Sequence, residues 1–162
     1  MSQGVTFRAA EPRDIDGIVQ LINGFAAERV MLPRTPESVA LALHDFIVAA
    51  DAHGGVVACG SLKEYSPSLA EVASLAVART AHAQGLGRQI VTRLESLARR
   101  RGIAELFALT LTPGFFEATG YVVTDRKRYP EKVRRDCAKC ERRFACAEVC
   151  VSRLLSAEAL AA

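Results

Sequence analysis

One strand–loop–helix unit restricts the possible folds of this chain more than any other feature. A β-rich run at residues 71–77 leads through a short polar loop to a Q-G-L-G turn at residues 84–87, which opens a long helix. The helix is expected to end in three arginines at residues 99–101, before Gly102, because cations in a last turn complement the helix dipole and glycine commonly follows the end. Such a turn presents backbone N–H groups at a helix N-terminus, which suits a phosphate or diphosphate.

The rest of the chain predicts an α/β fold. Apolar residues at helical spacing predict a helix with Pro12 in its first turn and a second helix that starts at Thr35-Pro36. The second helix is expected to bury Val39, Leu43, Phe46 and Ile47. Further strands are predicted at residues 5–9, 56–62, 70–77, 104–110 and 121–125, with a hairpin turn at 51–55 and a short helix at 113–119. Hairpins beside one strand–loop–helix–strand unit indicate a mixed sheet.

Length and composition are typical of one soluble domain. The 162 residues are enough to bury a core, and 50% of them are hydrophobic while 24% are charged. No apolar run is long enough for a bilayer, and the first ten residues lack the apolar stretch of a signal peptide. We therefore expect a cytoplasmic protein without membrane contact. The net charge of +3 is too small to indicate nucleic acid as a partner.

Other nucleotide-binding turns fit the sequence less well. A dinucleotide-binding fingerprint needs a third glycine where this chain has Ile90, and a P-loop needs Gly-Lys-Ser or Gly-Lys-Thr, which is missing. A tight loop without a ligand stays open as an alternative, because a lone G-x-G is weak evidence.

The segment S-L-A-V-A-R-T-A-H-A-Q-G-L-G-R-Q-I-V resembles the acetyl-CoA loop of the GNAT N-acetyltransferase superfamily, whose signature is Q/R-x-x-G-x-G/A. The matching positions are His82, Ala83, Gln84, Gly85, Leu86 and Gly87. His82 departs from the usual arginine or glutamine. A second segment, F-F-E-A-T-G-Y at residues 115–121, resembles the late F-[FY]-x-x-x-G-[FY] block of that family. The resemblance covers about residues 5–125. It implies a single domain over 1–162, with a mixed, mostly antiparallel sheet flanked by helices and a basic, Cys-rich tail at 126–162.

The resemblance also implies roles for residues around the loop. The strand before the loop would bind the pantetheine arm of the co-substrate, acetyl-CoA, through the backbone of Leu75, Ala76 and Val77. A backbone N–H around Ala76 would stabilise the charge that develops on the thioester oxygen. Arg88 or Arg79 would reach a CoA phosphate, and a solvated helix face is the plain alternative for both.

Catalysis in this family needs a base for the amine and a proton for the leaving thiolate. Glu71 matches the position of the general base in many members and would act through one water, unless it is a solvent-facing strand residue. Phe116 would cover the thioester end of CoA, and it stands where many members have a tyrosine as general acid. The proton donor is therefore left open among Tyr65, Thr112, Tyr129 and water.

Several segments resemble the short, single-domain N-acetylglutamate synthases. They are M-L-P-R-T at 31–35, C-G-S-L-K at 59–63, A-E-x-x-S-L-A-V at 70–77, L-F-A-L-T at 106–110 and Y-P-E-K-V-x-x-D-C-x-x-C-x5-C at 129–146. The departures are Ala73, Arg134, Glu141 and Ala147. This resemblance implies transfer of acetyl from acetyl-CoA to the α-amine of L-glutamate, which opens arginine biosynthesis.

Free glutamate carries two carboxylates, so its site should offer at least two cations. The resemblance suggests Arg34 before a helix N-terminus and Lys63 beside the acetyl-CoA strand, with Lys132 and Arg135 from the tail. Two alternative functions stay open. One is a GNAT acetyltransferase acting on another small-molecule or protein amine, and the other is an acetyl-CoA-binding sensor that docks on an acidic partner or nucleic acid.

The tail combines positive charge with thiols. Its cations are Arg126, Lys127, Arg128, Lys132, Arg134, Arg135, Lys139, Arg142 and Arg143. They predict either a solvated segment or a lid over an anionic ligand. Its thiols are Cys137, Cys140, Cys146 and Cys150, and Cys59 stands alone. The C-x2-C spacing is known from zinc sites, but the two halves lie closer than usual, so packed or free thiols are favoured over zinc. We expect no metal, and the sequence leaves a homodimer open.

Overall fold

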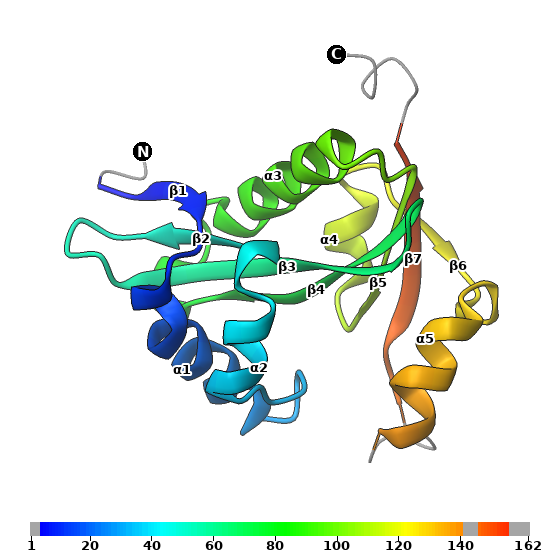
Figure 1. Ribbon diagram of the computed structural model, residues 1–162, viewed down its shortest axis with the longest axis horizontal. Helices are drawn as coiled ribbons and strands as arrows, with labels where there is room; N and C mark the ends of the chain where they lie inside the picture. Colours follow the sequence, from blue (N-terminus) through cyan, green and yellow to red (C-terminus); the bar gives the residue numbers. More distant parts are fainter. Residues whose placement is uncertain (1–3, 141–145, 156–162) are drawn as a thin grey trace. The chain divides into compact units, whose positions relative to one another are not determined.

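The computed structural model describes residues 4–140 and 146–155 of the chain. Its strands are β1 Thr6–Ala9, β2 Phe46–Ala50, β3 Val56–Ser66, β4 Leu69–Val77, β5 Glu105–Thr110, β6 Val122–Thr124 and β7 Val149–Leu154. Its helices are α1 Ile15–Ala26, α2 Pro36–Leu41, α3 Leu86–Arg100, α4 Pro113–Glu117 and α5 Pro130–Arg135, and its 3-10 turns are η1 Pro12–Asp14, η2 Leu43–Asp45, η3 Arg79–Ala81, η4 Arg126–Arg128 and η5 Cys137–Lys139. The strands form one hydrogen-bonded sheet in the order β1-β2-β3-β4-β5-β7-β6 (Figure 1). Among the pairs whose register is described, β4–β5 is parallel and the others are antiparallel, which confirms the expected mixed, mostly antiparallel sheet.

Internal contacts group the chain into two compact units. Unit 1 consists of Met1–Lys63 and Val72–Leu97, and unit 2 consists of Glu64–Glu71 and Ala98–Ala162. Strands β3 and β4 each run from one unit into the other. Within residues 4–140 and 146–155, no helix combines the length and the apolar character that crossing a membrane requires.

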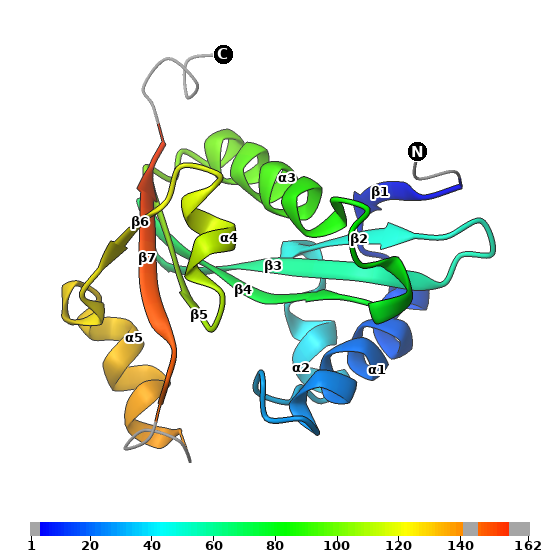
Figure 2. The same ribbon diagram turned by 180° about the vertical axis from the view of Figure 1, so that it is seen from behind.

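Unit 1 has helices on both faces of its strands (Figure 1 and Figure 2). Buried side chains of α1 and α2 pack with Cys59 of β3 and Ala76 of β4 in one apolar core. The next residue of β3, Gly60, faces α3: a Cβ there would lie 2.7 Å from Ile90 Cγ2 and 3.1 Å from Leu94 Cδ1. Because successive strand residues point to opposite faces, Cys59 and Gly60 mark the two covered faces of β3.

The second helix is shorter than the sequence predicts. It begins after Thr35, whose hydroxyl accepts a hydrogen bond from the Ser38 amide in a capping box, and it ends at Leu41. Phe46 and Ile47, which were expected in this helix, lie in β2 instead. All residues of β2 are buried, so the strand is a continuous apolar run that periodicity cannot distinguish from a buried helix.

In unit 2 the last described strand, β7, lies between β5 and β6 and pairs antiparallel with both. Its register with β5 runs from Glu105–Leu154 to Thr110–Val149. The sequence predicts that residues after 125 form a tail outside the core. In the structure these residues supply an inner strand of the sheet and the helix α5. The sheet of unit 2 depends on this segment.

A stacked aromatic pair fixes the start of α5 in unit 2. The rings of Tyr129 and Phe107 have centroids 4.1 Å apart and an interplanar angle of 7°. The Tyr129 hydroxyl donates a hydrogen bond of 2.7 Å to Glu105 Oε2. Burial, together with this carboxylate, raises the pKa of Tyr129 to about 12. Tyr129 directly precedes Pro130, the first residue of α5, so the helix starts from a fixed position.

Gly60→Ala is expected to lower the free energy of unfolding by about 1–3 kcal/mol, because the added methyl group overlaps Ile90 and Leu94. Urea denaturation followed by circular dichroism measures the change. The matched control is Gly24→Ala in α1, where an added Cβ meets no atom within 4 Å in the described structure and alanine favours a helix by about 1 kcal/mol. A Gly60→Ala protein as stable as the wild type would contradict the close packing of α3 on β3.

Candidate active site

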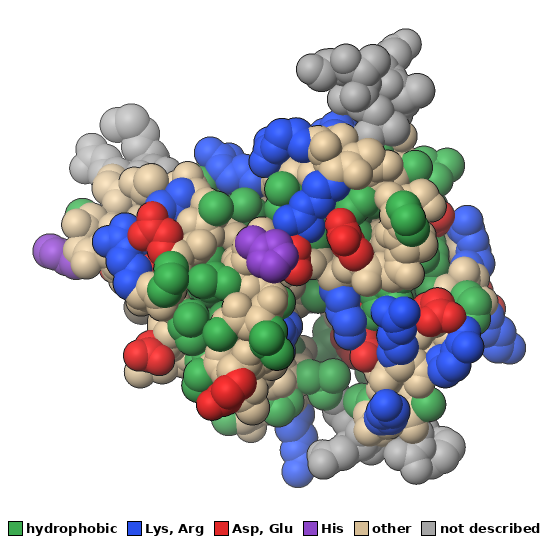
Figure 3. All heavy atoms as spheres, in the orientation of Figure 1, with side chains coloured by type: hydrophobic (Ala, Val, Ile, Leu, Met, Phe, Trp, Pro, Cys, Tyr) green, Lys and Arg blue, Asp and Glu red, His purple; other side chains and the backbone are tan. Residues whose placement is uncertain are grey.

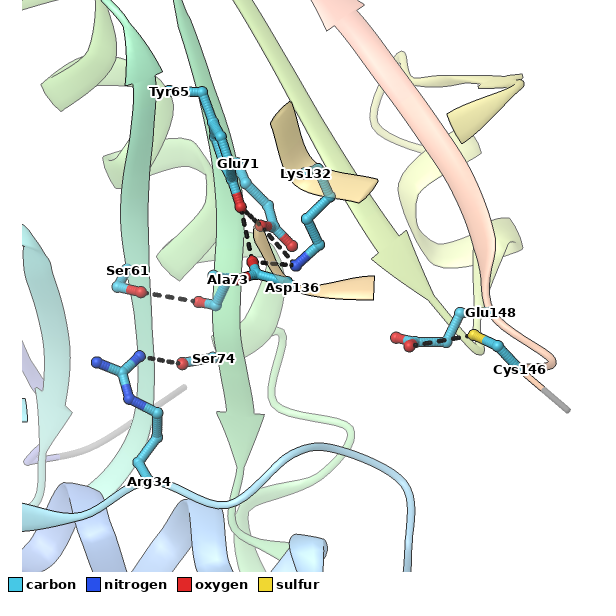
Figure 4. A network of polar contacts seen from close by, with 10 residues as sticks. All are labelled: Arg34, Ser61, Tyr65, Glu71, Ala73, Ser74, Lys132, Asp136, Cys146 and Glu148. Atoms are coloured by element: carbon cyan, nitrogen blue, oxygen red, sulfur yellow. Dashed lines mark hydrogen bonds and ion pairs between the residues drawn. The ribbon is translucent and has the colours of Figure 1, made fainter. Parts of the chain in front are cut away.

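The backbone of β4 is irregular at Ser74. Its φ of 52° lies in the left-handed region, which is uncommon for a residue with a side chain and often occurs at functional sites. Two consecutive carbonyl groups of β4 accept hydrogen bonds from β3 side chains. Ala73 O accepts from Ser61 Oγ at 3.2 Å (Figure 4), and Ser74 O accepts from Cys59 Sγ at 3.4 Å. These two side-chain bonds and the left-handed residue mark an irregular stretch of the strand.

Beyond Ser74, two alternate amides of β4, those of Ala76 and Ala78, bond to groups of β3. Burial raises the pKa of the Cys59 thiol to about 12, and the Ala76 amide opposes this rise by hydrogen bonding to the sulfur. The Ala78 amide donates to a β3 carbonyl at 2.8 Å. By alternation, the amides of Leu75 and Val77 point away from β3. Leu75, Ala76 and Val77 are the residues expected to bind pantetheine. Of their three backbone amides, those of Leu75 and Val77 are not directed at β3.

The loop between β4 and α3 holds two residues in the left-handed conformation. Ala83 has a φ of 69° and Gly85 a φ of 73°. The His82 ring nitrogen Nε2 lies 2.8 Å from Val77 O, so the side chain that departs from the GNAT pattern ties the loop to the end of β4. Left-handed residues turn nearby amides toward one side, and α3, which begins at Leu86, adds the positive end of a helix dipole. This loop fits a diphosphate.

The residues around this loop differ in their side-chain partners. Gln84 is exposed, and Gly87 is partly buried in the first turn of α3. Arg79 forms an ion pair with Glu28 and lies 5.3 Å from the centre of an aromatic ring of α1. Arg88 is exposed in the first turn of α3, and its guanidinium has no ion-pair or hydrogen-bond partner among the described residues. Of the two arginines, Arg88 is the better placed to meet a phosphate.

Arg34 is a partly buried cation whose described partners are all neutral. Its guanidinium donates to Ser74 Oγ at 3.1 Å (Figure 4), to Ser38 Oγ at 3.1 Å and to Ser38 O at 3.2 Å. It also lies 5.5 Å from the centre of the Phe46 ring. Asn23 fixes the Arg34 backbone through two hydrogen bonds of 2.9 Å. Burial lowers the pKa of Arg34, and no carboxylate among the described residues pairs with it. Because a partly desolvated charge without a counter-ion is unfavourable, this position suits an anion.

Glu71 lies in a buried polar network within unit 2 (Figure 4). Its Oε1 accepts a hydrogen bond of 3.1 Å from the Tyr65 hydroxyl and lies 3.1 Å from Lys132 Nζ. Asp136 Oδ2 contacts the same two groups, at 2.8 Å from the Tyr65 hydroxyl and 2.9 Å from Lys132 Nζ. Glu71 is 5% exposed and Lys132 is 9% exposed, so solvent screens these interactions poorly. Glu71 therefore does not face solvent.

Lys132, which is expected at the substrate site, lies in this network. Burial lowers its pKa, but the Glu71 and Asp136 carboxylates outweigh burial, so the pKa of Lys132 lies above its ordinary value. Its positive charge is already matched by two carboxylates. In this arrangement Lys132 contacts Glu71 and Asp136, and its contact with a substrate carboxylate stays a prediction.

The remaining cations expected at the substrate site lie on α5 and β3. The Arg135 Nε lies 3.3 Å from Glu131 Oε2, and its guanidinium is 5.3 Å from the centre of the Tyr65 ring. Lys63 is partly buried on β3, and by alternation it lies on the same face of the strand as Cys59. Contact of either cation with a substrate stays a prediction.

The aromatic residue expected at the thioester is part of the core of unit 2. Phe116 is 3% exposed and packs edge-to-face against Phe115 and Tyr121, each with ring centroids 5.1 Å away. Its place beside CoA stays a prediction.

The three side chains considered as proton donors have different surroundings. Tyr129 is buried and already donates to a carboxylate. Tyr65 contacts two carboxylates, and burial together with Glu71 raises its pKa above the ordinary value. Thr112 is exposed, with its hydroxyl 3.1 Å from that of Thr110. Of the two tyrosines, only Tyr65 contacts the candidate base.

The cysteines of the C-terminal segment do not form one site in the described structure. Cys150 is buried in the aromatic core of unit 2, whereas Cys146 Sγ accepts a hydrogen bond of 3.7 Å from Arg126. Within residues 4–140 and 146–155, no group of three or more His, Cys, Asp or Glu side chains is arranged to hold a metal ion.

Acidic neighbours balance the basic segment after residue 125. Arg134 and Arg135 pair with Glu131, and Arg128 lies 3.6 Å from a carboxylate of β5. On the face seen in Figure 3, Lys and Arg side chains over α5 stand beside Asp and Glu. Residues 141–143 of this segment lie outside the described residues. The described part is an ion-paired surface rather than a uniform cationic lid.

Sequence reasoning missed the residues that hold the candidate groups in place. Asn23 and Ser74 fix Arg34, and Asp136 contacts the network around Glu71. The segment that resembles the synthases at 129–146 includes Asp136, so the sequence contained a signal for this residue. The left-handed backbone of Ser74 has no such signal, because serine does not favour that conformation.

A comparison with known families decides the class of this site. The model of the acetyltransferase (GNAT) family matches residues 20–121, which include β4, the loop and α3. The chain belongs to the GNAT acetyltransferase family. The strand–loop–helix unit and its left-handed loop therefore belong to the part of the chain that identifies the family.

Relatives of this GNAT acetyltransferase include enzymes that act on amino acids. It is 36% identical over 148 residues to an uncharacterized N-acetyltransferase of Chlorobaculum tepidum, covering 91% of this chain and 95% of the relative. It is 32% identical over 116 residues, or 70% of this chain, to an amino-acid acetyltransferase of Mycobacterium tuberculosis. The structure of Neisseria gonorrhoeae N-acetylglutamate synthase, complexed with coenzyme A and N-acetyl-glutamate, matches 94% of this chain with a TM-score of 0.83 and 27% identity. The chain spans 66% of the mycobacterial enzyme and 35% of the Neisseria synthase.

Alkylation of the folded protein is expected to separate the cysteines by burial. Burial raises the pKa of Cys59 to about 12 and that of Cys150 to about 11, so little reactive thiolate forms at about pH 8. The partly exposed Cys137, Cys140 and Cys146 should react with iodoacetamide first. Mass spectrometry after timed labelling measures the order, and labelling in urea supplies the unfolded reference. If Cys59 reacted as fast as Cys140 in the folded protein, the described burial would be wrong.

Proposed function

We propose that this GNAT acetyltransferase transfers the acetyl group of acetyl-CoA to the α-amine of L-glutamate, and thereby serves arginine biosynthesis in the cytoplasm. The observation that carries the proposal is the partly buried Arg34 guanidinium, whose partners in the described structure are all neutral. A carboxylate substrate supplies the counter-ion. The likeness to an amino-acid acetyltransferase and to an N-acetylglutamate synthase supports glutamate as that substrate.

Arg34 can bind a carboxylate without losing its present contacts. A guanidinium has five N–H donors, and the bonds to Ser38 and Ser74 use three of them. The other donors are available for a charge-assisted bond, and the Asn23 bonds hold the Arg34 backbone in place. The second carboxylate of glutamate needs another cation, for which we assign Lys63.

The loop between β4 and α3 holds the diphosphate of acetyl-CoA in this proposal. The left-handed residues Ala83 and Gly85 and the first amides of α3 supply donors, and Arg88 supplies a positive charge. The Leu75 and Val77 amides bind the pantetheine arm and stabilise the thioester oxygen as its negative charge grows. The coenzyme A bound to the Neisseria synthase supports this assignment.

Glu71 takes the proton of the attacking amine in this proposal. The amine attacks only when it is neutral, and an ionised carboxylate accepts its proton directly or through one water. The strand β4 carries both Glu71 and the Leu75–Val77 backbone, so the base and the proposed thioester site belong to one element. Thiolate is a good leaving group, which is compatible with Phe116 in place of the family's tyrosine.

Purified protein is expected to release CoA thiol from acetyl-CoA faster with L-glutamate than with other amino acids or polyamines. Arg34→Ala should raise the KM for glutamate about tenfold or more and change the KM for acetyl-CoA little. A lost hydrogen bond between charged groups costs about 1.5–3 kcal/mol, which sets this expectation. A thiol-reagent assay measures both constants, and mass spectrometry identifies the acetylated product.

Arg13→Ala is the matched control for this experiment, because it removes an exposed arginine whose described ion pair is with Glu11. Should glutamate release no more thiol than buffer while another amine does, that amine would replace glutamate as the acceptor. Equal effects of Arg34→Ala on both KM values would remove the role assigned to Arg34.

Gly85→Ala is expected to weaken CoA binding by roughly fivefold or more, because a left-handed conformation costs a residue with a side chain about 1–2 kcal/mol. Titration calorimetry with CoA measures the affinity. Gly54→Ala is the matched control: Gly54 has a φ of 84° in the turn before β3, and an added Cβ there, as at Gly85, meets no described atom within 4 Å. Both variants should lose similar stability, and only Gly85→Ala should lose affinity. Equal CoA affinities would argue against the loop as the diphosphate site.

A further inference from the structure

The described contacts of the network around Glu71 join two carboxylates to one ammonium group. Lys132 contributes one positive charge, whereas Glu71 and Asp136 contribute two negative charges when both are ionised. Tyr65 bridges the two carboxylates through its hydroxyl and stays neutral, because burial and both carboxylates raise its pKa. Since Glu71 and Lys132 are buried, the balance of these charges acts strongly on each member.

Lys132 and Asp136 act on Glu71 in opposite directions. A cation 3.1 Å from a buried carboxylate favours its ionised form, and a second carboxylate in the same network disfavours it. Lys132 Nζ lies between the two, 3.1 Å from Glu71 Oε1 and 2.9 Å from Asp136 Oδ2. The protonation state of Glu71 therefore depends on both residues.

These two residues have a rigid support. Lys132 is in α5 and Asp136 is the residue that ends it, four positions later, so both side chains lie on one face of the helix. The start of α5 is held by Tyr129, stacked on Phe107 and bonded to Glu105. The position of the ion pair is thus fixed from the core of unit 2.

We propose that Lys132 and Asp136 are positioning residues, which hold Glu71 Oε1 in place and balance the charge of its carboxylate so that it is ionised and oriented when the amine binds. The inference rests on the proposed role of Glu71 as the base. Lys132 and Asp136 act through Glu71 and need no contact with the amine.

The titratable groups that face Glu71 come from several elements of unit 2. β3 supplies Tyr65, the α5 segment supplies Lys132 and Asp136, and β7 supplies Cys150. Burial, with a contribution from Glu71, raises the pKa of Cys150 to about 11, so this thiol stays neutral near neutral pH, as does Tyr65. Lys132 and Asp136 are therefore the charged side chains whose described contacts in this network act on the titration of Glu71.

Carbon-detected NMR of the ¹³C-labelled protein follows the titration of its Glu carboxyl groups, and the resonance that Glu71→Gln removes is that of Glu71. Lys132→Gln is expected to raise the titration midpoint of Glu71 by about one pH unit or more, and Asp136→Asn to lower it. Lys132→Arg keeps the charge and should stay near the wild type. Arg134→Gln is the matched control, because it removes an exposed cation of the same helix and should leave the midpoint unchanged.

Midpoints that shift in the same direction in Lys132→Gln and Asp136→Asn, or that do not move in folded variants, would overturn the inference. If Lys132→Gln does not fold, Asp136→Asn preserves the shape of the side chain and its shift decides. The acid limb of kcat/KM against pH should move with the NMR midpoint. Full turnover of Glu71→Gln would instead remove Glu71 as the base in the proposed function. If Glu71→Gln is inactive but the Glu71 midpoint does not move in Lys132→Gln and Asp136→Asn, only the positioning role is removed.

Discussion

The left-handed backbone at Ser74 is the constraint on which the arrangement of β4 depends. A residue in this conformation interrupts the regular geometry of a strand, so the direction of the amides that follow depends on it. The same residue places its hydroxyl against Arg34. Such backbone strain costs on the order of 1–3 kcal/mol, and the bonds from Ser61 and Cys59 to the two neighbouring carbonyls help to offset it. Ser74 thereby holds the Arg34 side chain beside β4, a few residues before the amides assigned to pantetheine.

The parts of the fold that follow from local physics were predictable from the sequence. Glycine at residues 85 and 102, the arginines at 99–101 and the helical spacing between them act over a few residues, and α3 begins and ends close to where they indicate. Strand β2 was partly misassigned because burial on both faces removes alternation. Strand β7 was missed because its partner β5 is distant in the sequence, and such pairing leaves no local pattern.

Lys132 shows why the candidate site was only partly predictable. The resemblance marked it as a functional cation, and a substrate carboxylate was the natural partner to expect. The structure places it against Glu71 and Asp136, and a contact with the substrate stays a prediction. A sequence pattern indicates that a cation will meet an anion, but it does not say which anion, because that depends on how α5 packs. Arg34 is the converse case, because its described partners are all neutral and we propose that a substrate carboxylate supplies its counter-ion.

The insertion of β7 between β5 and β6 has a consequence for synthesis of the protein. Until residues 149–154 have left the ribosome, β5 lacks its antiparallel neighbour, and the nascent chain carries an unpaired strand edge of the kind that promotes aggregation. β7 also supplies Cys150 to the core formed with Phe107 and Tyr129. The core that fixes the start of α5 is therefore incomplete until then. The polar network around Glu71, to which we assign the catalytic base, is therefore completed late, after most of the chain has been translated, and chaperones have the longest access to unit 2.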